Sequence, residues 1–313
     1  MALRSLTLDS LLIESVENYG RYNFLSFVDG EVMTYRDFYD RVVSLRKYMQ
    51  SLGIAKGDRV VLLSENQPNW AVSYFAITTL GAVVVPILTD FHAEEIDHIA
   101  RHAEAKAFFV SEKLIDKLRG VLEESEGPAF CVDELSVINR PLPKGSVKKA
   151  KEKWEPVKIE SQTVARLTDV KETDWASILY TSGTTGTSKG VILSHRNLVY
   201  DAEAASDIPG LKPGHRMLSI LPLAHTYECT IGLLTPFRLG VHINYLTKPP
   251  APVVLLPALQ KVRPNAMLSV PLLIEKIYRS AILPKFQKNF ALRLLYRFVP
   301  IRKLLNLMAG KKL

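Results

Sequence analysis

The 313-residue sequence contains very little cysteine. Cys131 and Cys229 are its only two, and they provide neither a disulfide framework nor the ligand spacing of a metal site. This usage is typical of a protein from a reducing compartment. We therefore expect a cytoplasmic protein in which both thiols are small, buried apolar groups.

Long apolar runs are also lacking. The most apolar stretch, from Ala76 to Leu88, contains Gly81 and Pro86 and is shorter than the roughly 20 residues that a membrane-spanning helix needs. The first 20 residues place acids among their apolar positions, unlike the uninterrupted apolar segment of a signal peptide. The sequence therefore predicts neither export nor a membrane span.

Basic clusters are scarce outside the end of the chain. The net charge is +8, but residues 276–313 contain ten Lys or Arg and no acid. No basic patch interleaved with aromatics occurs elsewhere, which excludes nucleic acid as a partner. The tail at 290–313 mixes apolar and basic residues, which suits peripheral contact with the anionic inner membrane face. The alternative is a helix, interrupted by Pro300, whose apolar stripe packs on the protein.

Apolar runs and helical periodicities alternate along the first 132 residues. Thr34 predicts the N-cap of a helix that continues to about Leu52, because apolar residues recur there at helical spacing. Continuous apolar strands separated by helices are typical of a parallel sheet covered on both faces. We therefore predict a doubly wound α/β fold with mostly parallel sheets in two lobes. The expected strands are 59–64, 82–87, 106–110 and 129–132, and the expected helices are 34–52, 68–80 and 93–105.

The alternating pattern fades between residues 139 and 174, which are rich in Pro, Lys, Glu and Ser. We interpret this stretch as a surface connection between the lobes. The predicted organisation is a first lobe at 1–160 and a second at 161–313, which carries the loop described next.

The stretch TSGTTGTSKG, from Thr181 to Gly190, contains six hydroxyl residues, three glycines and one lysine. It lies between two apolar runs, 175–180 and 190–195, that we predict to be short strands. Glycines let backbone N–H groups approach a ligand closely, hydroxyls donate hydrogen bonds, and Lys189 adds a positive charge. The composition predicts a loop that wraps a polyphosphate, and a flexible Ser/Gly linker is the competing interpretation.

A Walker A loop is excluded by the spacing. Gly183 and Gly186 are three residues apart, and Lys189 precedes a glycine and a strand. A Walker A lysine instead follows a longer glycine spacing and opens a helix.

Other catalytic motifs lack residues that they need. No G-x-S-x-G segment occurs, so a serine hydrolase has no nucleophile. His98 and His102 lack the glutamate of H-E-x-x-H and have acidic neighbours, which indicates a solvated helix face and not a metal site. His195 follows the hydroxyl-rich loop closely, but a helix that starts with Ser194 as its N-cap is an adequate explanation for this segment.

The residues from Tyr180 to Leu198, YTSGTTGTSKGVILSHRNL, resemble the signature loop of the adenylate-forming (AMP-binding) superfamily. Further segments resemble the same superfamily in the same order, and the last two are closest to its long-chain fatty acid–CoA ligase (acyl-CoA synthetase) branch. These segments are TYRDFYDRV at 34–42, SENQPNW at 64–70, LGAVVVPI at 80–87, LPLAHTYE at 221–228 and RPNAMLSVPLLIEKIY at 263–278.

This resemblance implies ATP-dependent activation of a fatty acid to an acyl-adenylate and then to acyl-CoA, with Mg²⁺ and coenzyme A. Thr181 would lie near the metal and the α-phosphate, and His225 beside the nascent adenylate and the acyl pocket. Without the resemblance, His225 would be a hydrogen-bonded histidine at a strand end. Thr181, Lys189 and His225 are the candidate catalytic residues. The implied phosphate-binding residues are Thr181, Ser182, Gly183, Thr184, Thr185, Gly186, Thr187, Ser188 and Lys189.

The resemblance covers only the N-terminal portion of such enzymes. The family's later segments for adenine, ribose and Mg²⁺, and its small C-terminal domain, have no counterpart before Leu313. We therefore expect the chain to be incomplete for catalysis, as a natural truncation, an incomplete reading frame or an expression fragment. The alternative interpretation is a non-catalytic nucleotide-binding or membrane-associated remnant of such a ligase.

Overall fold

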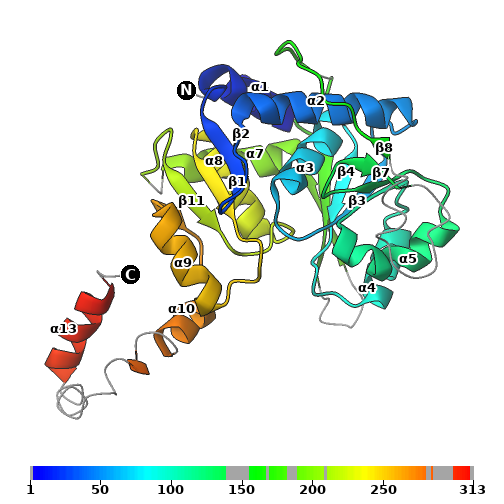
Figure 1. Ribbon diagram of the computed structural model, residues 1–313. Helices are drawn as coiled ribbons and strands as arrows, with labels where there is room; N and C mark the ends of the chain where they lie inside the picture. Colours follow the sequence, from blue (N-terminus) through cyan, green and yellow to red (C-terminus); the bar gives the residue numbers. More distant parts are fainter. Residues whose placement is uncertain are drawn as a thin grey trace.

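A computed structural model places two mostly parallel sheets side by side, with helices between and around them (Figure 1). This arrangement confirms the predicted α/β class with two mostly parallel sheets. The structure describes residues 3–138, 155–166, 169–181, 189–207, 210–279, 283–284 and 299–310.

The larger sheet has eight strands in the order β10-β9-β4-β3-β5-β6-β7-β8. Its parallel centre, β4-β3-β5-β6, consists of the four strands that the first 132 residues predict, within two residues at each end. The strands are β3 (Arg59–Leu63), β4 (Val83–Pro86), β5 (Ala107–Val110), β6 (Ala129–Cys131), β7 (Ser136–Val137), β8 (Glu155–Pro156), β9 (Trp175–Thr181) and β10 (Lys189–Ser194).

The smaller sheet has five strands in the order β13-β11-β12-β1-β2. They are β1 (Asn23–Phe27), β2 (Met33–Thr34), β11 (Arg216–Ser219), β12 (His242–Tyr245) and β13 (Ala266–Met267). β1 pairs in parallel with β12, and β9 pairs in parallel with β4. Each sheet therefore combines strands from both sides of residue 160, and a division of the chain into lobes there stays a prediction.

Helices lie between the sheets, on the outer face of the larger sheet and beside β11 of the smaller sheet, and one further helix lies in the tail. They are α1 (Leu8–Tyr19), α2 (Tyr35–Ser51), α3 (Pro68–Leu80), α4 (Ala93–His102), α5 (Ile115–Glu124), α7 (His195–Ala204), α8 (Thr235–Arg238), α9 (Pro252–Val262), α10 (Pro271–Ile277) and α13 (Val299–Gly310). Short 3-10 turns lie at Glu112–Leu114 (η1) and Ala205–Asp207 (η2), and a π-helix, η3 (Glu228–Leu234), precedes α8.

One buried core joins the two sheets. It includes residues of β1 and β12 from one sheet, β3 and β4 from the other, and the helices between them. Five aromatic rings form its centre, with ring centroids 4.5–5.5 Å apart in the contacting pairs. They are Phe24, Tyr35, Phe38, Phe75 and Phe237.

A second core lies on the outer face of the larger sheet. Apolar residues of α4 and α5 pack there against β3, β4, β5, β6 and β9. The two cores together bury both faces of β3 and β4. This double burial explains why both strands are continuous apolar runs without alternation.

Local sequence signals set the helix starts that were predicted. Thr34 caps α2 in a capping box with Asp37, Pro68 is the first residue of α3, and Ser194 caps α7 by accepting a hydrogen bond from the N–H of Asn197. In each case the first-turn N–H groups either gain an acceptor or, at proline, are absent.

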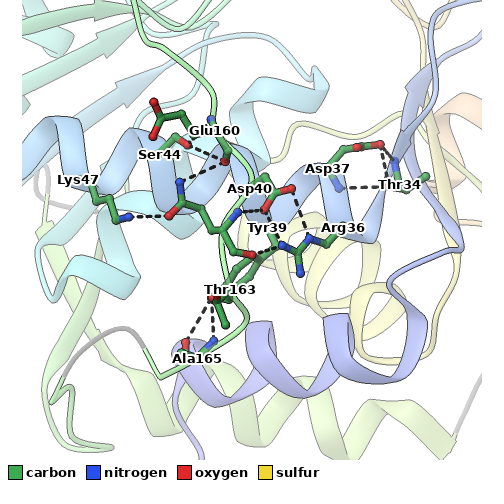
Figure 2. Close-up of polar contacts among 11 residues, drawn as sticks. Thr34, Arg36, Asp37, Tyr39, Asp40, Ser44, Lys47, Glu160, Thr163 and Ala165 are labelled. Atoms are coloured by element: carbon green, nitrogen blue, oxygen red, sulfur yellow. Dashed lines mark hydrogen bonds and ion pairs between the residues drawn. The ribbon is translucent and has the colours of Figure 1, made fainter.

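The polar stretch at 139–174, which the sequence predicts to connect two lobes, is partly described, because residues 139–154, 167 and 168 lie outside the described residues. The segment 158–165, which we call the strap, runs along α2 and is hydrogen-bonded to it (Figure 2). Ser44 Oγ accepts a hydrogen bond from the N–H of Glu160 at 3.1 Å. The hydroxyl of Tyr39 accepts one from the N–H of Ala165 at 3.0 Å. The strap is therefore held by the helix surface and is not a loose tether.

The basic tail contains α13, but residues 290–298 and 311–313 lie outside the described residues. Within the described part, no helix combines the length and the apolar character that crossing a bilayer requires. Peripheral membrane contact by the tail stays a prediction.

Candidate functional site

The hydroxyl-rich segment begins and ends in a pair of antiparallel strands. In the register of β9 and β10, Thr181 lies opposite Lys189, and Tyr180 lies opposite Gly190. The two predicted strands that flank the segment are therefore confirmed. Residues 182–188, which include most of the predicted phosphate-binding residues, lie outside the described residues. The structure thus brings Thr181 and Lys189 together, and both are exposed.

Gly190 allows this hairpin to close tightly beside the segment. A Cβ at this position would lie 3.0 Å from Cγ2 of Ile178 and 3.4 Å from the ring of Tyr180. A side chain there would crowd these two side chains of β9, so the third glycine of the motif leaves room for them.

The hairpin opens at the carboxyl edge of the larger sheet. β9 runs parallel to β4, and β4 runs parallel to β3, so Thr181 lies at the edge where these strands end. In open α/β sheets, ligands bind outside the carboxyl ends of the strands. The position of Thr181 and Lys189 is therefore the one where a ligand is expected.

The segment with His225 comes from the smaller sheet and reaches the same place. It follows the last residue of β11, and Ala224 and Thr226 line a narrow cavity together with Ser177 and Leu179 of β9. The side chain of His225 is exposed and has no hydrogen bond to another described residue. It differs in this respect from a hydrogen-bonded histidine at a strand end.

Sequence reasoning assigned no role to Glu228, which lies three residues after His225. Its side chain is fully buried, and its Oε1 accepts a hydrogen bond from Ser219 Oγ at 2.5 Å. Burial raises the pKa of Glu228 to about 7, and the hydrogen bond from Ser219 opposes the shift. One sequence signal could have identified it: Glu228 directly precedes the apolar run CTIGLL, and an acid at the start of a buried segment is unusual.

Two other histidine positions have structural roles in the described residues. His195 is fully buried, its Nδ1 accepts a hydrogen bond from the N–H of Leu8 at 3.2 Å, and burial lowers its pKa to about 4, although Asp174 opposes the shift. It is therefore neutral at physiological pH. His102 lies 2.7 Å from the hydroxyl of Tyr180 and so joins α4 to β9. Both cysteines are buried and free, as predicted.

These features define a class of protein: an α/β protein of two mostly parallel sheets whose edge loops carry a hydroxyl-, glycine- and lysine-containing hairpin and a histidine. The model of the AMP-binding enzyme family matches residues 12–307. The chain belongs to this family, and the family predicted from the motifs is confirmed.

Curated relatives in this family include fatty acid ligases. The chain is 33% identical over 235 residues to the long-chain-fatty-acid–CoA ligase FadD15 of Mycobacterium bovis, which covers 74% of this chain and 37% of the relative. It is 31% identical over 263 residues to a long-chain-fatty-acid–CoA ligase of Yersinia pestis, which covers 77% of this chain and 47% of the relative. The chain thus spans less than half the length of these relatives.

Solved structures share the fold. ATP-bound MatB from Rhodopseudomonas palustris matches with a TM-score of 0.71 at 22% identity, over 88% of this chain and 52% of that one. The inhibitor-bound N-terminal domain of FACL13 from Mycobacterium tuberculosis matches with a TM-score of 0.70 at 20% identity, over 88% and 65%. At these identities the likeness establishes the architecture of the N-terminal domain of adenylate-forming enzymes.

Proposed function

We propose that this chain is the part of an ATP-dependent fatty acid–CoA ligase that binds the phosphates of ATP and the acyl group. The observation that carries the proposal is the register pair of Thr181 and Lys189, which holds both ends of the hydroxyl- and glycine-rich segment at the carboxyl edge of the sheet. Membership of the AMP-binding family supports ATP as the nucleotide. The names of the relatives support a long-chain acyl group.

In the proposed reaction, a carboxylate oxygen of the fatty acid attacks the α-phosphorus of ATP, and pyrophosphate leaves. The thiol of coenzyme A then attacks the acyl carbon, loses its proton, and AMP leaves. The residues contribute position and charge: the Thr181 hydroxyl donates to a phosphate oxygen, and Lys189 balances negative charge. His225 would lie beside the acyl carbonyl group.

The described residues fit a magnesium ion only with help from the nucleotide. Thr181 offers one hydroxyl oxygen at the edge of the site, and no cluster of three His, Cys, Asp or Glu that could hold a metal occurs within the described ranges. Mg²⁺ in nucleotide sites is commonly held by substrate phosphates and few protein oxygens. A magnesium ion bound with ATP would neutralise phosphate charge, and among the described residues Thr181 would offer it a hydroxyl oxygen.

The proposal is tested by nucleotide binding, measured as thermal stabilisation and by calorimetry with Mg-ATP. In Lys189→Ala we expect the affinity to fall about tenfold or more, because a charge-assisted contact to phosphate is lost. Lys212→Ala is the matched control. Lys212 is also exposed, but it precedes the amino end of β11, whereas Thr181 lies at the carboxyl end of β9. We expect the control to bind as the parent does.

An equal affinity of the parent and Lys189→Ala, or no binding by the parent, would contradict the phosphate role. Addition of a long-chain fatty acid separates the ligase from a nucleotide-binding remnant. In the ligase interpretation, we expect the acid and ATP to increase each other's affinity, because the two substrates bind in adjacent subsites and contact each other. A remnant would bind ATP with no response to the acid.

A further inference from the structure

The segment 220–227, which we call the histidine segment, is held at its beginning by one side chain from the other sheet. Asn66 Nδ2 donates a hydrogen bond to the carbonyl oxygen of Leu221 at 2.6 Å. Its Oδ1 accepts a hydrogen bond from the N–H of Leu223 at 2.8 Å. A single carboxamide therefore satisfies a backbone acceptor and a backbone donor in the turn that leads to His225.

Asn66 is itself fixed at the carboxyl end of β3. Gln67 Nε2 donates to Ser64 Oγ at 2.9 Å, and the carboxylate of Glu65 accepts from Ser111 Oγ at 2.5 Å. The next residue, Pro68, begins α3. The loop that presents Asn66 is thus tied to β5 on one side and to a helix start on the other.

The end of the histidine segment is held by Glu228. Its Oε1 accepts a hydrogen bond from the hydroxyl of Ser219, the last residue of β11, and Ser219 Oγ also lies 3.4 Å from Asn66 Nδ2. The second oxygen, Oε2, is buried and has no hydrogen-bond partner among the described residues. A Cβ at Gly232 would lie 2.6 Å from Cδ of Glu228, so this glycine makes room for the carboxyl group inside the π-helix.

Packing alone does not explain a carboxyl group at this position. Burying a polar group costs free energy unless hydrogen bonds compensate, and an apolar side chain of similar volume would avoid this cost. Hydrogen bonds, unlike apolar contacts, fix both distance and direction. In addition, π-helical turns are rare and are frequently found at functional sites, and here the π-helix begins at Glu228 itself.

We propose that Asn66, Ser219 and Glu228 are positioning residues that bracket the histidine segment and fix His225 where the carboxyl edges of the two sheets meet. None of the three needs to contact a ligand. Asn66 sets the turn before His225, and Glu228, through Ser219, sets the first turn after it. The positioning itself follows from contacts within the chain, whereas the use of His225 beside an acyl group rests on the proposed function.

Amide hydrogen exchange tests the bracket without any ligand. In Asn66→Ala the N–H of Leu223 loses its acceptor, and we expect its exchange to become about tenfold faster, the size of one lost hydrogen bond. Amides of α2 serve as the internal reference for folding. Asn69→Ala is the matched control, because Asn69 lies only three residues later, in the first turn of α3, but its Nδ2 donates to the carbonyl oxygen of Asp133. Unchanged exchange at Leu223 in a folded Asn66→Ala protein overturns the proposal.

A second readout separates positioning from general packing. The imidazole resonances of His225, identified by their loss in His225→Gln, report its surroundings. At about pH 6 we expect these resonances to shift in Glu228→Leu and to stay near the parent position in Glu228→Gln, which keeps an oxygen that accepts from Ser219. A shift of equal size in both variants, or in neither, contradicts the role of Glu228.

The two proposals fail separately. If the exchange and resonance changes are not observed, the positioning role of Asn66, Ser219 and Glu228 is wrong, whatever the chain binds. If the parent does not bind ATP, the proposed function is wrong, and the exchange experiment still tests the positioning role independently.

Discussion

At the residue scale, Glu228 is an acid buried among uncharged side chains. Glu228 is surrounded by Ser219, Cys229 of its own helix, Tyr245 of β12 and, beyond Cys229, Tyr74 of α3. These groups are neutral at physiological pH, because burial raises the pKa values of Tyr74 and Tyr245 well above their ordinary value and that of Cys229 to about 12. Ionising Glu228 therefore places a charge in a low-dielectric interior without a compensating cation among these neighbours.

This predicts a specific dependence of stability on pH. The folded-state pKa of Glu228, about 7, is above the ordinary value of 4.5, so the folded chain holds this proton more tightly than the unfolded chain. Its contribution to the free energy of unfolding is full below pH 4.5 and is lost as the pH rises toward 7, by roughly 3 kcal/mol. In Glu228→Gln we expect that loss to disappear, as measured by urea unfolding between about pH 5 and pH 8.

The comparison with the parent removes the opposite contribution of His195. The pKa of His195 is lowered to about 4, so its contribution to stability is present above its ordinary value of 6.5 and falls as the pH drops toward 4. This contribution is the same in both proteins. Glu94→Gln, an exposed acid on α4, controls for the change of charge. A parallel pH profile in the parent and Glu228→Gln would show that Glu228 is ionised in the folded chain.

At the scale of elements, α2 has two separate functions in the fold. One face packs in the core that joins the sheets, with Phe38 and Val42 fully buried. Another face binds the strap, with Tyr39 and Ser44 as hydrogen-bonding partners (Figure 2). The helix therefore links a polar segment of the middle of the chain to the aromatic centre.

Removing one hydroxyl from α2 should loosen the strap. In Tyr39→Phe the hydrogen bonds to the carbonyl oxygen of Thr163 and from the N–H of Ala165 are lost. We expect a loss of about 1 kcal/mol in the free energy of unfolding and faster exchange of the Ala165 amide. Tyr48→Phe, on the same helix, is the control, because the Tyr48 ring faces Phe130, with the two ring centroids 6.4 Å apart, and not the strap. Equal exchange at Ala165 in all three proteins would contradict a strap held by α2.

At the scale of the whole molecule, the two sheets share one aromatic centre and should unfold together. Phe237 contacts rings from β1, α2 and α3, and it stacks on Tyr35 with an interplanar angle of 16°. In Phe237→Ala we expect a loss of about 3–5 kcal/mol in a single transition, because the cavity affects both sheets. Leu272→Ala, at a residue that is 74% exposed, should change stability little. Two separate transitions in the parent would contradict a shared core.

The amino-acid sequence alone determined the elements whose signals are local. The N-caps at Thr34 and Ser194, the proline that begins α3 and the apolar runs of β3 to β6 all act over a few residues, and the structure confirms them. The loop motif likewise identified the family, because composition and spacing within one segment carried that information.

Only the tertiary structure decided which distant residues meet. β1 joins a sheet whose other parallel strands lie about two hundred residues later, and Asn66 binds the turn at 221–223. Glu228 is likewise buried beside Ser219 of β11 and Tyr245 of β12, which come from separate strands. Contacts of this kind depend on how separately formed elements pack, because burial and long-range hydrogen bonds are set by the surfaces that meet and leave no periodic trace in the chain.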